Sequence, residues 1–248
     1  MENITHDYLL GKKIRLFQKK DAYKTSSDAV LLASSVDITK ENAKILDVGA
    51  GVGGVSLCLA YRYKKADITG FEIQKDLADL ANLNAKENGF DHVNYLCQDI
   101  ASKKMPCPFC SFDVVVTNPP YAKDGTKSPN VSKALAHLQQ NITLKQWIAF
   151  CIKMLKPKGK LYLINRAEAL DDILSALSPQ MGGVTVLPIY SKQNDKAKRI
   201  IITAQKDSKA PLKILPPLYL RDNNGYTKYT EDILRGRILS LNNTADKN

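Results

Sequence analysis

The stretch "AKILDVGAGVG", residues 43–53, decides the fold, because an apolar run passes directly into a series of glycines. The run 43–48 is typical of a buried strand, and "VSLCLAYRY" (55–63) is typical of a helix. The loop between them contains three glycines, Gly49, Gly51 and Gly53. Glycine lets the backbone turn sharply and approach a ligand closely, so the strand, the loop and the helix together indicate a candidate ligand site.

The rest of the chain alternates between strand-like and helix-like segments. Further strands are expected at 66–72, 93–99, 112–118, 160–166, 183–190 and 198–206. Helices are expected at 26–36, 75–89, 142–159 and 169–178. This alternation predicts an α/β fold, with a Rossmann-like, seven-stranded, mostly parallel sheet and helices on both faces. We expect residues 1–248 to form a single domain, in which an N-terminal segment (1–40) precedes a core at 41–240.

The composition is that of an ordinary globular protein with an excess of positive charge. Hydrophobic residues make up 44% of the 248 residues, and 36 Lys and Arg face 25 Asp and Glu, a formal net charge of +11. Such an excess favours a polyanionic partner, although a solvated basic surface gives the same charge. No run approaches the length of a membrane span and the first residues do not resemble a signal peptide, so we expect a cytoplasmic protein.

The five cysteines do not suggest a disulfide framework. Their odd number and their scatter through apolar segments indicate reduced thiols. "CPFC" (107–110) has the spacing of half a zinc site, but no second such pair and no paired histidine stands near it. We therefore expect a loop that contains two cysteines, and no metal ion.

Three acidic residues stand where predicted strands end. Asp47 immediately precedes the glycines, Glu72 closes the second strand and Asp99 closes the third. Asp47 would repel a pyrophosphate but could accept a hydrogen bond from a cationic amino group. Glu72 could accept both hydroxyls of a ribose, and Asp99 could accept from an adenine amino group. S-adenosylmethionine has all three parts and no phosphate; alternatively, each acid is an ordinary strand-end residue.

The segment "TNPPY" (117–121) ends the fourth predicted strand. Proline breaks a strand and Asn-Pro often opens a turn, so the segment could be purely structural. At the carboxyl end of a central strand it could also bind a ligand. The Asn118 side-chain carbonyl and the Pro119 carbonyl would then accept the two N–H groups of an exocyclic amine, while Pro119 and Pro120 fix the backbone. Tyr121 would stack on the base.

With these residues in place, the chain resembles the class I, Rossmann-like methyltransferases. "TNPPY" is similar to the N/D-P-P-Y/F motif of enzymes that methylate exocyclic or amide nitrogens. The resemblance is strongest to the bacterial tRNA (adenine-N6)-methyltransferase family that acts on an anticodon-loop adenine of valine tRNA. Residues 9–34 are similar to that family's N-terminal segment, and residues 226–236 to its terminal helix, so the resemblance spans nearly the whole chain. One departure is Ala22, where the family commonly has glycine.

The resemblance implies S-adenosylmethionine as the cofactor, tRNA as the substrate, and an N-terminal segment that covers the cofactor. From the residues themselves we expect no membrane and no metal; the sequence does not give the oligomeric state, and a monomer is favoured. The residues implied for catalysis are Asn118, Pro119, Pro120 and Tyr121. The residues implied for cofactor binding are Tyr23, Ser26, Asp28, Asp47, Gly49, Ala50, Gly51, Gly53, Glu72, Ile73, Asp99, Ile100 and Asn118.

Other functions stay open on the sequence. A release-factor glutamine methyltransferase or an rRNA guanine-N2 methyltransferase would use the same motif, but release-factor enzymes carry a helical N-terminal domain, for which we find little room before residue 43. A DNA adenine methyltransferase usually adds a target-recognition region, and a non-catalytic RNA-binding module would not need every strand-end group. RNA binding is expected from basic residues outside the site, namely Lys12, Lys13, Arg15, Lys19, Lys20, Lys192, Lys196, Lys198 and Arg199.

Overall fold

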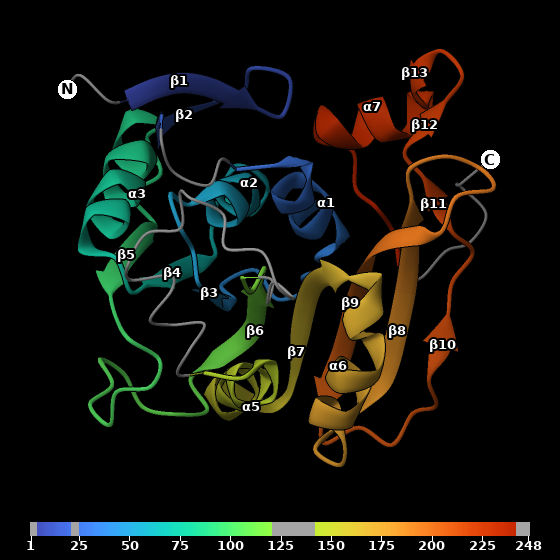
Figure 1. Ribbon diagram of the computed structural model, residues 1–248. Coiled ribbons are helices and arrows are strands. Elements are labelled where there is room, and N and C mark those ends of the chain that lie inside the picture. Colours follow the sequence, from blue (N-terminus) through green and yellow to red (C-terminus); the bar gives the residue numbers. More distant parts are fainter. Residues whose placement is uncertain (1–3, 21–24, 121–141, 242–248) are drawn as a thin grey trace.

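In the residues that the structure describes, the protein is built around a nine-stranded sheet with helices on both faces (Figure 1). The computed structural model describes residues 4–20, 25–120 and 142–241. Five neighbouring strands are parallel, in the order β5 (Val93–Cys97), β4 (Asp67–Glu72), β3 (Lys44–Val48), β6 (Phe112–Thr117) and β7 (Leu155–Arg166). The predicted α/β fold with a mostly parallel sheet is confirmed.

The antiparallel end of the sheet corrects the predicted number of strands. After β7 come β9 (Ala197–Lys206) and β8 (Met181–Tyr190), with β9 antiparallel to both of its neighbours. Two strands of two residues each pair with the outer edge of β8, namely β10 (Lys213–Ile214) and β11 (Leu218–Tyr219). Among the described residues the sheet therefore has nine strands and not seven. Prolines at 211, 216 and 217 flank the short strands, and because proline cannot donate to a ladder, no strand-like pattern marks them.

Two layers of helices cover the sheet (Figure 1). One face carries α1 (Ser27–Ser35), α2 (Gly54–Arg62) and α3 (Lys75–Glu87), and the other carries α5 (Leu144–Met154) and α6 (Leu170–Leu177). Along β6, Val114 and Val116 belong to the core under the first layer, and Val115 belongs to the core under the second. Because both faces of β6 are buried at these positions, Val114, Val115 and Val116 follow one another without a polar residue between them.

The boundaries differ most from the prediction at two places. The helix predicted over 142–159 ends at Met154, and β7 begins at the next residue. Pro157 has no N–H and disfavours helical geometry at the residue before it, which explains why the helix ends early. β5 ends two residues before the predicted position, so Asp99 lies in the loop that follows.

An antiparallel hairpin that the sequence did not reveal lies outside the sheet, over α2 and α3 (Figure 1). Its strands are β1 (Ile4–Leu9) and β2 (Ile14–Lys19). Two amides of α3 hold it. Asn84 accepts from the Phe17 N–H at 2.8 Å and donates to the Phe17 carbonyl at 3.1 Å. Asn88 binds the N–H and the carbonyl of Arg15 in the same way, at 2.9 and 2.7 Å.

The C-terminal part of the chain returns to this hairpin. A two-rung ladder of β12 (Arg221–Asp222) and β13 (Gly225–Tyr226) precedes α7 (Lys228–Leu234). α7 lies beside α1, and just after it the Arg235 carbonyl accepts from the Lys13 ammonium at the hairpin tip, at 3.0 Å. Segments from both ends of the chain therefore meet on one side of the molecule (Figure 1). Across the described ranges, no helix is both long and apolar enough to cross a membrane.

Candidate active site

The carboxyl ends of the central strands reach the same level in the sheet. Val48 of β3 is paired with Phe71 of β4 and with Thr117 of β6. The residues that follow them are Gly49, Glu72 and Asn118, of which Glu72 is the last residue of β4 and the other two lie just beyond the ends of β3 and β6. β3 and β6 are neighbours, and the chain proceeds from them to opposite ends of the sheet. This edge is therefore the switch point, where α/β sheets bind ligands.

The glycine loop has the left-handed backbone that its sequence predicts. Positive φ angles of 76°, 57° and 92° occur at Gly49, Gly51 and Gly53. The N–H groups of Gly49 and Ala50 donate to the Phe71 carbonyl at 2.9 and 3.0 Å, so the loop folds over the end of β4. A Cβ on Gly49 would lie 2.9 Å from Trp147, whereas a Cβ on Gly51 would meet no atom within 4 Å. The loop is thus packed at its start and open at Gly51.

Glu72 ties the glycine loop to the end of β4. The residue is only 6% exposed, and its two carboxylate oxygens accept from the N–H groups of Gly51 and Gln74, each at 2.9 Å. Burial raises the pKa of Glu72, and the backbone hydrogen bonds oppose this rise. The carboxylate is therefore held in a fixed position beside the loop, where the sequence placed a ribose acceptor.

Asp47 is buried between β3 and α2. The residue is 1% exposed, and the Ser56 hydroxyl of α2 donates to its Oδ2. Burial raises the pKa of Asp47 to about 6, although the hydrogen bonds from Ser56 act in the opposite direction. A buried carboxylate without a cation is costly to ionise, so a positively charged group brought close to Asp47 would be stabilised.

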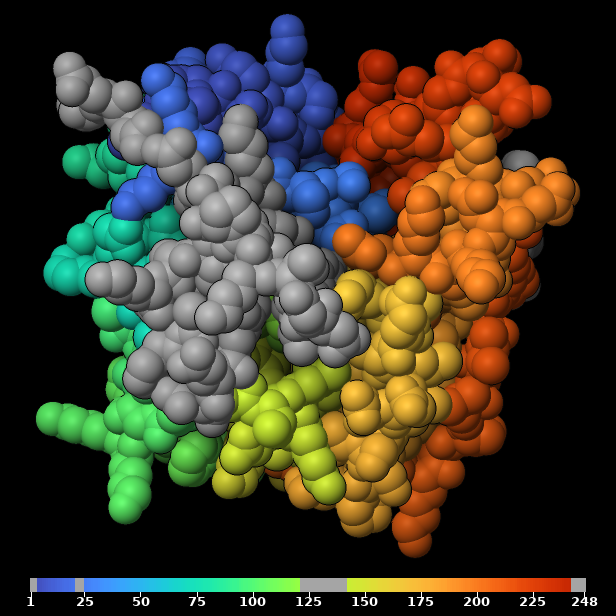
Figure 2. All heavy atoms as spheres, in the orientation of Figure 1, coloured from blue at the N-terminus to red at the C-terminus, as the bar shows by residue number. Residues whose placement is uncertain are grey.

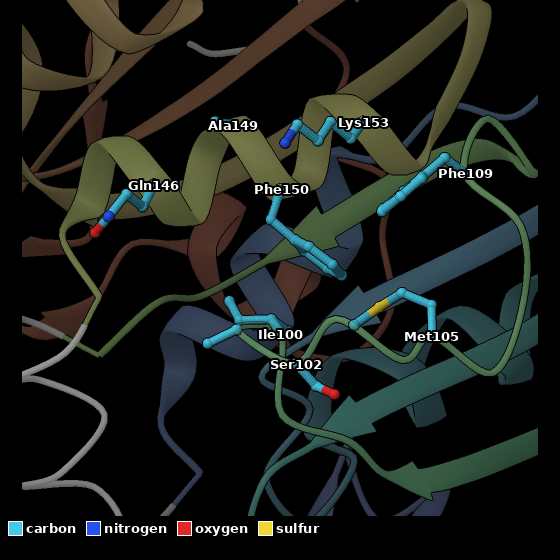
Figure 3. Close-up of a pocket in the computed structure, with 9 residues that line it drawn as sticks. Ile100, Ser102, Met105, Phe109, Gln146, Ala149, Phe150 and Lys153 are labelled. Atoms are coloured by element: carbon cyan, nitrogen blue, oxygen red, sulfur yellow. The ribbon is translucent and has the colours of Figure 1, made fainter.

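Asp99 is exposed at the border of two adjacent cavities. The Asp99 Oδ1 accepts from the Ala101 N–H at 2.8 Å. Asp99 also lines a cavity of about 390 Å³. A second cavity, of about 290 Å³, lies between the same loop and α5. Ile100 and Met105 face Phe150 across this second cavity (Figure 3). Apolar walls next to an exposed acceptor suit a planar base with an amino group.

Asn118 is half-buried, and the residue before it is fixed by two hydrogen bonds. The Thr117 hydroxyl donates to the Val48 carbonyl at 2.8 Å and accepts from the Trp147 indole N–H at 2.9 Å. These bonds join β6, β3 and α5 at the point where the chain leaves the sheet. The start of the predicted motif is therefore attached both to the strand that carries the glycine loop and to the helix behind it.

The remaining predicted residues are only partly described. Pro119 is buried and Pro120 is half-buried, directly after Asn118. Tyr121 and Tyr23 lie outside the described residues. The stacking role of Tyr121 and the covering role of Tyr23 therefore stay predictions.

Ser26 and Asp28 lie at the start of α1, close to the glycine loop. Ser26 caps α1, since its side chain accepts from the Asp28 N–H at 3.2 Å. Asp28 forms an ion pair with Arg199 of β9, with 3.0 Å between Oδ2 and Nε. A Cβ on Gly54 would lie 2.5 Å from Thr25, so the segment that enters α1 packs directly on the first residue of α2.

Two aromatic residues that support the loop were not predicted from the sequence. Trp147 packs on Gly49 and bonds to Thr117, and the ring of Tyr95 occupies the space that a Cβ on Gly53 would need. A signal for Trp147 existed, since the chain has one tryptophan and it lies on the apolar face of a predicted helix. The helical pattern alone does not say which strand or loop that face meets.

The "CPFC" segment lies in a loop between β5 and β6, as predicted. Cys107 is half-buried and Cys110 is exposed, and both are free thiols. Burial raises the pKa of Cys107. In the described part of the chain, no three His, Cys, Asp or Glu side chains form a group that could hold a metal ion.

The fold is shared with solved methyltransferase structures. One protein from Agrobacterium tumefaciens, described as a "predicted O-methyltransferase", is 26% identical, with a TM-score of 0.73 over 87% of this chain and 100% of that chain. The site also suits the cofactor of such enzymes, because it offers carboxylates at the ends of β3 and β4, a third carboxylate in the loop after β5, and a glycine loop that is open at Gly51. The fold and the site define an S-adenosylmethionine-dependent methyltransferase of class I, as predicted.

The comparison of sequences narrows the class. The pattern of the methyltransferase small domain matches residues 25–189, and the chain belongs to this family. A relative from Parabacteroides distasonis is 31% identical over 181 residues, which are 71% of this chain and 76% of that protein. A relative from Dyadobacter fermentans is 26% identical over 222 residues, 87% of this chain and 90% of that protein. Both are named tRNA1(Val) (adenine(37)-N6)-methyltransferase.

Proposed function

We propose that the protein transfers a methyl group to N6 of an adenine in the anticodon loop of a valine tRNA. The two relatives described above carry this activity in their names. An enzyme that modifies tRNA works where tRNA is present, so we place it in the cytoplasm. We further propose one domain, because the hairpin packs on α2 and α3 and α7 packs on α1, and we propose a monomer.

The cofactor, when bound, supplies an electrophilic methyl group on a sulfonium. We assign its amino group to the neighbourhood of Asp47, its ribose to Glu72, and its base to Asp99 with the apolar side chains of Ile73 and Ile100. The openness of the loop at Gly51 and the burial of the first two carboxylates support this assignment. The proposed set also includes the loop and the N-terminal segment, that is Tyr23, Ser26, Asp28, Gly49, Ala50, Gly51, Gly53 and Asn118.

The acceptor nitrogen needs orientation more than it needs a base. The lone pair of an exocyclic amine is delocalised into the ring, and it becomes available when the nitrogen pyramidalises. The Asn118 side-chain carbonyl and the Pro119 backbone carbonyl would accept the two N–H groups, which leaves the lone pair pointing away from both oxygens. Tyr121 would stack on the base, and an unpaired loop adenine can leave its stack at low cost.

One observation carries this proposal, namely the pairing of Val48 with Thr117. It places the start of the glycine loop next to Asn118, and the hydrogen bond from Thr117 to Val48 fixes that arrangement. The two acceptors proposed here, the Asn118 side-chain carbonyl and the Pro119 carbonyl, would suit an amine with two N–H groups. A hydroxyl acceptor, as in an O-methyltransferase, has one hydrogen and would leave one of the two oxygens without a donor.

The test is a methyl-transfer assay on an unmodified valine tRNA transcript, with labelled S-adenosylmethionine, digestion to nucleosides and chromatography. We expect labelled N6-methyladenosine from the wild-type protein. Asn118→Ala should lower kcat by about 100-fold with little change in KM, because the lost acceptor acts mainly as the amine pyramidalises. Asn94→Ala, at an exposed position on β5, is the matched control. Labelled N2-methylguanosine from the transcript, or methylglutamine from a protein substrate offered in parallel, would contradict the assigned acceptor.

A further inference from the structure

Five exposed basic residues from distant parts of the chain gather on one surface, which we call the basic ledge. They are Lys12, Lys13, Lys64, Arg235 and Arg237. They come from the tip of the β1–β2 hairpin, the turn after α2 and the segment after α7. Figure 2 shows the hairpin in dark blue and the α7 region in red next to each other along one border of the molecule.

A shared aromatic ring joins two of these cations. The Lys13 ammonium lies 5.6 Å from the centre of the Tyr61 ring, and the Lys64 ammonium lies 4.8 Å from the same centre. Lys64 also lies 4.8 Å from the centre of the Phe90 ring. Each cation–π contact at an exposed site contributes about 0.5–1 kcal/mol, enough to favour one position of a flexible lysine. Both ammonium groups are therefore held against the same ring, although like charges repel.

The C-terminal arginines extend this charge. The Arg235 carbonyl accepts from Lys13 at 3.0 Å, and the Arg237 guanidinium lies 4.7 Å from the centre of the Tyr229 ring. Two acids face the arginines, with Glu231 3.7 Å from Arg235 and Asp232 3.5 Å from Arg237. Five basic residues against these two acids leave an excess of three positive charges. A bound anion would relieve the repulsion among them.

The position of the ledge in the sequence separates it from the cofactor site. The methyltransferase small domain spans residues 25–189, and four of the five ledge residues lie outside that range. Segments before and after the shared domain thus meet to form a surface that the domain alone lacks. Among the other basic residues expected to bind RNA, Lys19 pairs with Asp76 and Arg199 pairs with Asp28, so part of their charge is balanced within the protein.

We propose that the basic ledge binds the phosphate backbone of the RNA substrate, away from the base that is methylated. This inference rests on the proposed function, which supplies the RNA. Lysine and arginine side chains are the usual partners of phosphate oxygens, and such contacts fix the position of a nucleic acid without reading its sequence. The ledge would therefore set affinity, whereas the strand-end site would select and orient the base.

The test compares two double variants with equal loss of charge. Lys12→Gln/Lys64→Gln removes two ledge cations without touching the bond from Lys13 to Arg235. Lys103→Gln/Lys209→Gln removes two exposed lysines from the opposite end of the molecule, in the β5–β6 loop and after β9 (Figure 1). Binding of a fluorescently labelled valine tRNA transcript is measured by anisotropy at several salt concentrations, and methylation kinetics are measured with the same transcript.

For the ledge variant we expect the Kd to rise by about 10-fold near physiological salt, and the slope of log K against log salt to become shallower by about 1.5. The control variant should change both values much less, and kcat at saturating RNA should stay unchanged in both. Tyr61→Leu removes the shared ring but no charge, so it should weaken binding by about threefold with an unchanged slope.

Equal Kd and slope in the ledge and control variants would overturn the ledge, whether or not the transcript is methylated. A larger rise in Kd in the ledge variant than in the control variant would support the ledge. If the transcript were then bound but not methylated, the proposed acceptor would be contradicted instead. Unlabelled transcript and heparin can also be compared as competitors of the labelled transcript, at matched concentrations of phosphate and sulfate groups. If heparin competes as well as the transcript does, the ledge binds polyanions in general, and its role for RNA is overturned.

Discussion

Replacing Asp47 by Asn tests whether burial raises the pKa of this carboxylate in the cofactor-free protein. The substitution keeps the shape of the side chain, and its carbonyl can still accept from the Ser56 hydroxyl. The folded-state pKa of Asp47 is about 6, against an ordinary value of 3.8. Between these two pH values, the folded protein holds a proton that the unfolded chain has released. The wild-type protein should therefore lose stability as the pH rises through this window, and Asp47→Asn should not.

The magnitude follows from the pKa gap. At about 1.36 kcal/mol for each pKa unit, the gap corresponds to about 3 kcal/mol in full. Roughly 2 kcal/mol of this falls between pH 4.5 and pH 7.5. The free energy of unfolding of Asp47→Asn, relative to wild type, should rise by that amount across the range. Glu72 titrates in both proteins, so its own contribution largely cancels in the difference.

The assay is urea unfolding at several pH values, followed by the fluorescence of Trp147, the single tryptophan of the chain, which is buried. Asp76→Asn is a control of opposite sign. The hydrogen bond and ion pair with Lys19 lower the pKa of Asp76, so the stability it contributes is lost as the pH falls. A difference between Asp47→Asn and wild type that stays within about 0.5 kcal/mol from pH 4.5 to 7.5 would refute the reasoning.

Three further predictions concern the loop and its supports. Gly51→Ala places a methyl group on a backbone with φ of 57°, so we expect the free energy of unfolding to fall by about 1 kcal/mol. The free energy of cofactor binding, measured by calorimetry, should fall by far more, because the methyl group would stand on the open face of the loop. A cofactor affinity within threefold of wild type would contradict this role of the open face. Trp147→Phe removes the indole donor to Thr117, so the free energy of unfolding, followed by circular dichroism, should fall by about 1–2 kcal/mol. The same variant should lower kcat more than it changes KM. Glu72→Ala should weaken S-adenosylmethionine binding by about 10-fold or more, since a lost charge-assisted pair of hydrogen bonds is worth at least about 1.4 kcal/mol; unchanged affinity would remove Glu72 from the ribose role.

The core of the fold was predictable because its signals are local. A strand that is buried on both faces is rich in consecutive apolar residues, and β3 and β6 contain such short stretches in Ile45–Leu46 and Val114–Val116. Each run ends where the chain becomes polar or glycine-rich, as at Gly49 and Asn118. The strand ends, and with them the candidate cofactor residues, could therefore be placed from the sequence before their contacts were known.

The hairpin was not predictable in the same way, because its pattern is interrupted. β2 buries Ile14 and Leu16, but the next inward position is Gln18. Gln18 is satisfied by donating to Asp7 at 2.8 Å and by accepting from the Thr25 N–H at 2.6 Å. A buried amide of this kind breaks the apolar alternation that marks a strand, and its partners become visible only in the folded chain.

The support of the site was hidden for a different reason. Trp147 and Thr117 are 30 residues apart, and their hydrogen bond depends on how α5 packs against the sheet. The length of α5 itself was overestimated, since the proline effect at Pro157 acts on residues before it. Sequence patterns identify which face of a helix is buried, but the partner of each buried side chain is set by tertiary packing.

The two asparagines of α3 limit where the hairpin can sit. Asn84 and Asn88 are separated by about 6.0 Å along a helix, at about 1.5 Å per residue. Arg15 and Phe17 are separated by about 6.8 Å along a strand, at about 3.4 Å per residue. One helical turn therefore nearly equals one strand repeat, and each amide can bind the N–H and the carbonyl of alternate residues. A third rung would be out of step by about 1.6 Å, so a helix can act as the neighbour of a strand over two rungs only. Because a slip by one residue would present the wrong edge of β2, this short ladder sets the register of the whole hairpin, and it thereby determines where Lys12 and Lys13 stand relative to the end of α7.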